Sequence, residues 1–374
     1  MAKAYLHIGT PKTGTTSLQR FLSANSRLLE ESGFLFPKFG FSYPNVSSYR
    51  NGYFISRTDA SPFVEQREES YRRLAELARD GRDIILTDEA IWMRQRKRGF
   101  WKAIGKRFRE MGLELHIVVY LRRQDALVES YWNQRVKGNR LTESFDEFMQ
   151  GAFRTMPLHY DNRLSVIRDE GKPESIIVRV FERDQMVNGS TIDDFCRIIG
   201  FVRIEDCVVP ASDANTSFPM DVAEVKRLIN RNASYEGMDK FFTQAIADTY
   251  TPEDAVAARN LSLLTMAERK ELLQEFEEGN AYVAREFLNR QDGRLFYEPI
   301  RESKKWSPEP KELFPALVRV LSGTDILLYK RIMELEQKVA SLSEALEAAN
   351  RDDVTYSFKK RFGRKWLFQG KDRR

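Results

Sequence analysis

The chain has 374 residues, of which 42% are hydrophobic, enough for one large domain or two ordinary ones with a sizeable core. Its net charge is +5, but residues 359–374 hold eight Lys or Arg and one Asp, so the remainder carries −2. A nearly neutral body argues against a nucleic-acid partner, which usually requires a basic face. Neither a membrane-spanning apolar run nor a signal peptide is visible, and only Cys196 and Cys207 are present. We therefore expect a reducing, cytoplasmic setting.

Apolar runs of strand length alternate with helical patterns over the first 200 residues or so. We expect strands at 4–8, 83–87, 115–121 and 175–181, and helices at 15–31, 66–80, 100–111, 125–137 and 190–199. This alternation predicts the α/β class, with a P-loop-like parallel sheet flanked by helices. Ligands bind at the carboxyl ends of the strands in such sheets. The loop at 9–14, the pair Asp88-Glu89 and the arginines at 122–123 should therefore meet at one edge.

The C-terminal part reads as a helical extension. Residues 267–288 carry apolar positions at helical spacing, and Pro308 and Pro310 mark a boundary. Beyond them, a two-heptad coiled-coil seam is formed by Ile332, Leu335, Val339, Leu342 and Leu346. We divide the chain into a main domain at 1–300, a connecting segment at 301–330, a short coiled coil at 331–350 and a basic aromatic tail at 351–374.

The loop after the first strand reads G-T-P-K-T-G-T-T-S from Gly9 to Ser17. Such a loop turns several backbone N–H groups toward one point at a helix N-terminus, where they suit a phosphate-like anion. The nucleotide P-loop pattern is G-x-x-x-x-G-K-[ST]. Here Gly14 is followed by Thr15, and the lysine, Lys12, precedes that glycine. A P-loop kinase, which is the first alternative interpretation, would need the missing Gly-Lys-Thr order.

The run P-K-T-G-T-T-S resembles the 5′-phosphosulfate loop of sulfotransferases that use 3′-phosphoadenosine-5′-phosphosulfate (PAPS). A second segment strengthens the resemblance, because Arg122 ends a strand and Ser130 follows eight residues later, as in the family's 3′-phosphate site. Many members read R-N-P-x-D there, whereas this chain reads R-R-Q-D, with Asp125 one place early. The resemblance covers about residues 1–300 and is most detailed toward bacterial sulfotransferases.

The resemblance implies transfer of a sulfuryl group from PAPS to a hydroxyl acceptor, with no metal and with adenosine 3′,5′-bisphosphate (PAP) as product. Lys12 would contact the oxygen that bridges phosphate and sulfate, and Arg122 with Ser130 would bind the 3′-phosphate. The implied donor site consists of Lys12, Thr13, Gly14, Thr15, Thr16, Ser17, Arg122 and Ser130. The structural alternative for Arg122 is an exposed helix start paired with Asp125.

The acceptor hydroxyl needs a general base, which in this family is a histidine or a glutamate. Glu89 follows the apolar run at 83–87 and should face the loop, so we assign it as the base. Its alternative role is helix capping, which Asp88 fits better. Among the three histidines, His7 and His116 lie in strands, whereas His159 lies in an irregular stretch and is the alternative base.

Family analogy implies a carbohydrate or glycolipid acceptor. Two segments are candidates for contacting it: the aromatic stretch at 34–54, whose alternative role is core cover, and the basic run from Trp92 to Trp101, whose alternative is a solvated face. The seam at 331–350 predicts a homo-oligomer, and a non-catalytic assembly scaffold is the second alternative for the whole chain. The tail suits peripheral contact with the inner membrane surface, against the alternative of a solvated tail.

Overall fold

The computed structural model describes residues 1–39, 46–57, 63–94, 99–210, 217–231, 239–248, 261–300 and 302–362, with the backbone alone from 347 onward. Three parts of the predicted features lie outside the described residues. They are residues 40–45 of the aromatic stretch, residues 95–98 of the basic run, and the tail beyond residue 362.

A five-stranded parallel sheet occupies the centre of the molecule, with the strand order β2-β3-β1-β4-β5. The strands are β1 (Ala2–His7), β2 (Phe34–Leu35), β3 (Asp83–Thr87), β4 (Leu113–Leu121) and β5 (Ser175–Val180). In the central register, Leu6 of β1 lies beside Leu86 of β3 and Ile117 of β4. The predicted α/β class with a parallel sheet is confirmed. All carboxyl ends of these strands meet at one edge, the edge where the loop after β1 begins.

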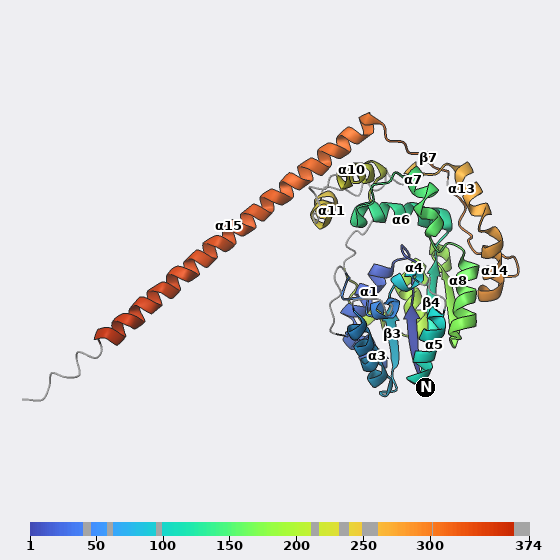
Figure 1. Cartoon of the computed structure of the whole chain (residues 1–374), viewed down its shortest axis with the longest axis horizontal. Coiled ribbons are helices and arrows are strands. Elements are labelled where there is room, and N and C mark those ends of the chain that lie inside the picture. Colours follow the sequence, from blue (N-terminus) through green and yellow to red (C-terminus); the bar gives the residue numbers. More distant parts are fainter. Residues whose placement is uncertain are drawn as a thin grey trace, which may run out of the picture.

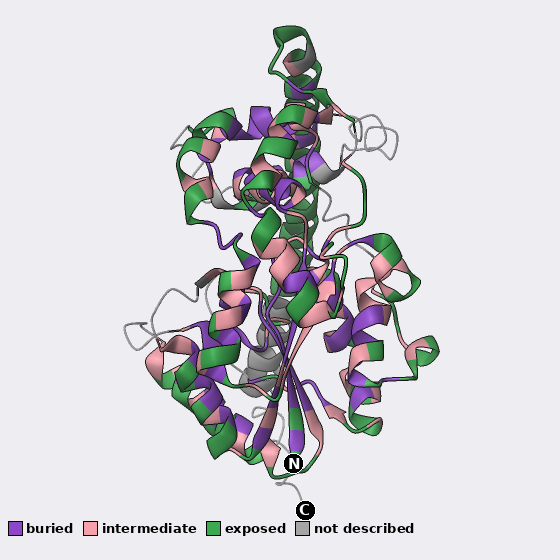
Figure 2. Ribbon diagram, turned by 90° about the vertical axis from the view of Figure 1, so that its right-hand side faces the viewer, coloured by how far each residue is buried: buried purple, intermediate pink, exposed green. Residues whose placement is uncertain are grey.

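Successive side chains of each strand point to opposite sides of the sheet. Both sides carry apolar residues, and helices bury each of them. Tyr5 packs with one group, formed by α1 (Thr15–Ala24), α2 (Ser26–Glu31) and α9 (Thr191–Ile199). Ala4 and Leu6 pack with the other, formed by α3 (Val64–Ala78), α5 (Phe100–Glu110) and α8 (Tyr160–Val166). Figure 2 shows the strands as a buried layer between these helices.

The remaining elements lie beyond the carboxyl edge or link the layers. They are α4 (Ala90–Arg94), α6 (Gln124–Asn139), α7 (Phe145–Gln150), α10 (Met220–Asn230), α11 (Asp239–Asp248), α13 (Met266–Gln274), α14 (Glu277–Leu288), α15 (Pro310–Phe362) and the paired strands β6 (Leu261–Ser262) and β7 (Lys304–Lys305). Short 3-10 turns occur at Tyr53–Ser56, Ala152–Thr155, Arg183–Gln185, Val187–Gly189 and Ile204–Asp206, and a π turn at Ile167–Gly171.

The structure differs from the predicted elements in a few places. The helix predicted at 15–31 is divided at Asn25, whose side-chain amide donates to the carbonyl oxygen of Val208 at 2.8 Å and accepts from its N–H at 2.8 Å. The helix predicted at 267–288 is divided where Phe276 enters the core. No periodic pattern predicts β2, because two residues are too few to show one.

The helix α15 leaves the body as one long rod (Figure 1). It begins at Pro310, as the proline boundary predicts, and runs without interruption across residue 330, where we expected the coiled coil to begin. Within the described part of the chain, none of the helices combines the length and the apolar character that crossing a membrane requires.

Candidate functional site

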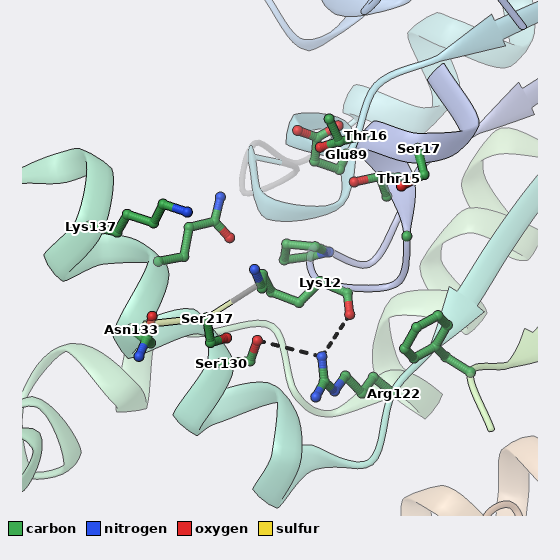
Figure 3. A pocket seen from close by; sticks show the side chains of 14 residues that line it. Lys12, Thr15, Thr16, Ser17, Glu89, Arg122, Ser130, Asn133, Lys137 and Ser217 are labelled. Carbon is green, nitrogen blue, oxygen red and sulfur yellow. Dashed lines mark hydrogen bonds between the residues drawn. The ribbon is translucent and has the colours of Figure 1, made fainter. Parts of the chain in front are cut away.

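A cavity of about 280 Å³ opens at the carboxyl edge of the sheet, where β1, β3 and β4 end. Three separate segments reach it: the loop after β1, Glu89 after β3, and Arg122 at the end of β4 with Ser130 on α6 (Figure 3). Its lining residues are Pro11, Lys12, Gly14, Thr15, Thr16, Ser17, Glu89, Arg122, Ser130, Asn133, Gln134, Lys137, Phe181 and Ser217. The structure thus gathers the predicted site residues around one space, with the exception of Thr13.

Gly14 shapes the end of the loop that contacts the cavity. It precedes α1 with φ +76°, in the left-handed region, and a Cβ there would lie 2.9 Å from Thr191 Oγ1. Only glycine meets both conditions without strain. The first turn of α1 holds Thr15, Thr16 and Ser17 and carries no acidic residue. Because the first N–H groups of a helix have no intrahelical acceptor, this end favours an anion.

Hydroxyls inside the loop hold its shape. The N–H and Oγ1 of Thr10 both donate to the carbonyl oxygen of Tyr120, at 2.8 and 3.0 Å. Thr13 is fully buried, and its Oγ1 donates to the carbonyl oxygen of Thr10 at 2.6 Å. The Thr13 side chain therefore stabilises the loop from within and does not line the cavity. This differs from the direct donor contact that the resemblance implies.

Lys12 lies at the tip of the loop with φ +66°, a conformation that costs a non-glycine residue about 1–2 kcal/mol. Arg122 supports it, because Nη1 donates to the carbonyl oxygen of Lys12 at 2.8 Å. The same nitrogen lies 3.5 Å from Ser130 Oγ, so the guanidinium joins the loop to α6 (Figure 3). On the other side, Tyr160 donates its hydroxyl to the carbonyl oxygen of Arg122 at 2.6 Å.

The carboxylates nearest to Arg122 are paired with other cations. Asp125 accepts from Arg123 Nε at 2.8 Å and from Arg269 Nη1 of α13 at 2.6 Å. Arg269 Nη2 also donates to Glu129 at 2.5 Å. The direct Arg122–Asp125 pair that formed the structural alternative is therefore replaced by pairs with Arg123 and Arg269. Arg122 remains directed at the cavity.

Three cations surround the cavity with few acidic neighbours: Lys12, Arg122 and Lys137. Burial, with the charges of Arg122 and Lys137, lowers the pKa of Lys12 to about 8. Burial also lowers the pKa of Lys137 and of Arg122. Lys12 and Lys137 point into the same space from opposite walls (Figure 3). A bound anion would relieve this repulsion, so the electrostatics favour a phosphate- or sulfate-bearing ligand.

Glu89 lies on the wall of the cavity with its side chain 22% exposed. Gln19 Nε2 donates to Oε2 at 2.8 Å, and Arg50 Nε lies 3.5 Å from Oε1. Gly9 allows the strand end to approach, because a Cβ on it would lie 3.0 Å from Glu89 Cβ. Asp88 is buried beside it and accepts from the N–H of Ala90 at 3.2 Å and from Arg50 Nε at 2.8 Å. Asp88 thus makes the capping contact that was expected of it.

None of the three histidines, all of which are described, lines this cavity. His159 is 51% exposed, with Nε2 3.5 Å from Glu275 and its ring packed on Phe276. His7 is fully buried, its Nδ1 lies 2.9 Å from Thr87 Oγ1, and burial lowers its pKa to about 3, so it is neutral. His116 bonds Ser175 on the neighbouring strand. The structure does not bring His159, the alternative base, to the site.

Phe181 and Ser217 line the cavity, and neither was predicted as part of the site. Phe181 directly follows β5, and its ring lies 5.8 Å from the Arg122 guanidinium. Its position at the end of a parallel strand was a signal that could have identified it. Ser217 precedes α10, far from any motif, and offers no such signal. Asn133 lies on the same helix as Ser130, and its amide pairs with the backbone of Phe218, at 2.7 and 2.8 Å.

A second cavity of about 460 Å³ extends the first. The two share Gly14, Ser17, Arg122 and Phe181, and the second continues toward Met186 and neighbouring residues. The remaining lining residues of the second cavity are Arg123, Ala126, Glu182, Arg183, Gly189, Ser190, Thr191, Ile192 and Glu298. Together they leave room for a ligand larger than a single phosphate.

The aromatic stretch contributes to the core where it is described. Phe36, Phe39, Tyr53 and Phe54 are all buried, and the Phe54 ring lies 4.9 Å from both Phe39 and Tyr71. For these residues the core-cover alternative is confirmed. Trp92 and Trp101, at the two ends of the basic run, are also buried.

Comparison with known proteins gives distant similarities. No protein-family model matches the chain. It is 28% identical over 175 residues to an uncharacterized protein of Archaeoglobus fulgidus, a match that covers 46% of this chain and 45% of that protein. The chain therefore spans about half the length of this curated relative. A crystal structure of a sulfotransferase from Alicyclobacillus acidocaldarius is similar over 63% of this chain and 98% of that chain, with 20% identity and a TM-score of 0.37.

Proposed function

We propose that this protein transfers a sulfuryl group from PAPS to a hydroxyl acceptor. The observation that carries the proposal is the convergence of two anion-binding features in one cavity. One is the loop at the start of α1 with Lys12, and the other is Arg122 with Ser130. A donor with a phosphosulfate at one end and a separate 3′-phosphate at the other matches two such features.

The residues present fit this donor. The N-terminus of α1 and Lys12 suit the 5′-phosphosulfate, since both stabilise negative charge. The planar guanidinium of Arg122 suits bidentate contact with the 3′-phosphate, and the Ser130 hydroxyl is within reach of the same group. The second cavity, which adjoins the first at Gly14, Ser17, Arg122 and Phe181, supplies space for the nucleoside.

In the proposed reaction the S–O bond to the donor phosphate breaks and a bond from sulfur to the acceptor oxygen forms. Lys12 stabilises the charge that grows on the departing phosphate oxygen, and Glu89 takes the proton of the acceptor hydroxyl. Gln19 and Arg50 orient the Glu89 carboxylate by holding one oxygen each. The chemistry rests on positioning and electrostatics and requires no metal.

We propose a carbohydrate or glycolipid as the acceptor. Gln134 and Ser217 line the same cavity, and their amide and hydroxyl groups suit an acceptor rich in hydroxyls. This acceptor class rests on family analogy.

Calorimetry without magnesium tests the donor assignment. The protein should bind PAP at least tenfold more tightly than AMP or ATP, because only PAP occupies both anion-binding features. Lys12→Ala should abolish transfer from labelled PAPS to a cell extract, whereas Lys102→Ala, a change at an exposed lysine of α5, should not.

Equal affinity for AMP and PAP would overturn the assignment of the 3′-phosphate site. Tighter binding of ATP with magnesium than of PAP would instead favour the P-loop kinase interpretation. Retention of full biological function without Lys12 and Glu89 would favour the assembly scaffold.

A further inference from the structure

The first half of α15 carries two apolar rows on opposite faces. The inner row faces the body and packs against α10 and α11. It is buried or half-buried and consists of Leu313, Ala316, Val320, Gly323 and Leu327. These residues recur at intervals of three and four, as expected for one face of a helix.

The outer row lies on the opposite side of α15 and is longer. It consists of Phe314, Val318, Leu321, Asp325, Leu328, Ile332, Leu335, Val339, Leu342 and Leu346. Its apolar members are 45–69% exposed, so no described part of the chain covers them. The spacing alternates between four and three throughout, which is the heptad repeat of a coiled coil. The apolar spacing of the predicted seam from Ile332 to Leu346 therefore continues back to Phe314, and the whole outer row spans about 48 Å at 1.5 Å per residue.

The continuation of the two rows beyond residue 327 distinguishes their roles. The positions that extend the inner row past the body are all polar: Lys330, Glu334, Gln337, Ser341 and Glu344. The outer row stays apolar over the same stretch, from Leu328 to Leu346. Contact with the body therefore accounts for the inner row alone, and the outer row must be matched by something else.

We propose that the outer row pairs two copies of this chain in a parallel, two-stranded coiled coil. Three of its five a positions hold the β-branched residues Val318, Ile332 and Val339, and four of its five d positions hold leucine. β-Branched residues at a with leucine at d favour two strands over three or four. A second copy of the same helix has the shape and apolar pattern that the seam requires.

Charges beside the seam favour the parallel orientation. Arg331 lies at a g position and Glu336 at the following e position, and these two positions face each other across a parallel pair. The charged g positions, Arg331 and Lys338, are both basic, so an antiparallel pair would bring cations together. In the single chain Arg331 contacts Glu334 at 2.8 Å, but that pair is more than half exposed and worth little.

Asp325 is the polar exception in the outer row, at an a position. In a parallel pair it would lie opposite its own copy. A single polar residue at an a position fixes the register of a coiled coil and lowers its stability. Because two carboxylates of like charge would meet there, Asp325 would weaken the pairing and keep the association reversible.

Sedimentation equilibrium on the full chain tests the proposal. The wild type should sediment as two chains. The double variant Leu335→Lys/Leu342→Lys should dissociate at least roughly a hundredfold more readily, because it places four charges in the seam. The matched control Gln337→Lys/Ser341→Lys adds the same charge to the polar face and should remain dimeric. A monomeric, trimeric or tetrameric wild type would overturn the proposal, as would equal behaviour of the two variants.

Cross-linking tests the orientation. Leu342→Cys in a Cys207→Ser background should form a disulfide-linked dimer under mild oxidation, because a d residue meets its own copy in a parallel pair. Gln337→Cys should not form this dimer, and failure of Leu342→Cys to form it would contradict the parallel arrangement.

Charge reversal tests the contact between g and e positions. Glu336→Arg should weaken the dimer, and adding Arg331→Glu to that variant should restore it. Asp325→Ile should tighten the dimer by roughly tenfold. The proposal is independent of sulfuryl transfer, since donor binding should be the same in all these variants.

Discussion

The lowered pKa of Lys12 predicts a specific pH dependence of donor binding. In the free protein, burial with Arg122 and Lys137 brings this pKa to about 8, against an ordinary value of 10.5. A bound anion favours the charged lysine and should return the pKa toward its ordinary value. PAP should therefore bind best below pH 8 and progressively less well above it, with uptake of a proton by the protein.

The size of the effect follows from the two pKa values. Between pH 7 and pH 9 the affinity for PAP should fall by about tenfold, or about 1.4 kcal/mol. At pH 9 the complex should take up about 0.9 proton per chain, because Lys12 is mostly neutral in the free protein and charged in the complex. Phosphate groups titrate near pH 6, so they contribute little over this range.

Calorimetry in buffers of different ionisation enthalpy measures both quantities. Lys12→Arg keeps a permanent charge and should lose most of the proton uptake. Lys137 has a lowered pKa as well, so the proton uptake that remains in Lys137→Met comes from Lys12. That uptake should be smaller than in the wild type, because removing the Lys137 charge also raises the pKa of Lys12 in the free protein. Constant PAP affinity from pH 7 to pH 9 without proton uptake would refute this prediction. Lys12 would then not contact the bound anion.

Three further predictions concern the same site. Glu89→Gln keeps the shape of the side chain but removes its basicity, so turnover should fall by roughly 10²-fold or more with donor affinity nearly unchanged. His159→Ala should change neither quantity, and the opposite pattern in stopped-time assays would make His159 the base. Arg122→Lys keeps the charge but loses the planar fork, and it should reduce the preference for PAP over AMP by roughly 10- to 100-fold. An unchanged ratio of calorimetric affinities would contradict that role. Gly14→Ala should lower the melting temperature and weaken PAP binding, because its Cβ would lie 2.9 Å from Thr191 Oγ1 and its φ of +76° costs about 1–2 kcal/mol. A variant as stable as the wild type would disprove this account of the loop.

The parts of the fold that local patterns specify were predictable. The strands β1, β3, β4 and β5 are short apolar runs, and each was predicted within about two residues of its ends. Features that depend on distant partners were not. The division at Asn25 comes from its bonds to Val208, which is 183 residues away, and β2 exists because Phe34 and Leu35 pair with β3.

The site shows the same division. The meeting of Lys12, Arg122 and Ser130 in one cavity was predictable, because their spacing belongs to motifs and the parallel sheet brings such motifs to one edge. The direction of the Thr13 hydroxyl was not predictable, since it bonds within the loop and the sequence does not indicate this. On α15, Asp325 interrupts the apolar pattern and the inner row overlaps it, so only the later heptads of the outer row were recognised.

The bond from Arg122 to the carbonyl oxygen of Lys12 limits how this site can change. The same guanidinium supports a left-handed residue in the loop and faces the proposed 3′-phosphate position. A substitution of Arg122 that adapts the site to a donor without the 3′-phosphate would therefore also remove the hydrogen bond that holds Lys12 at the tip of the loop. A switch of donor specificity requires a second substitution that holds Lys12 in place, so single-residue libraries at position 122 should yield inactive variants and not variants with a new donor.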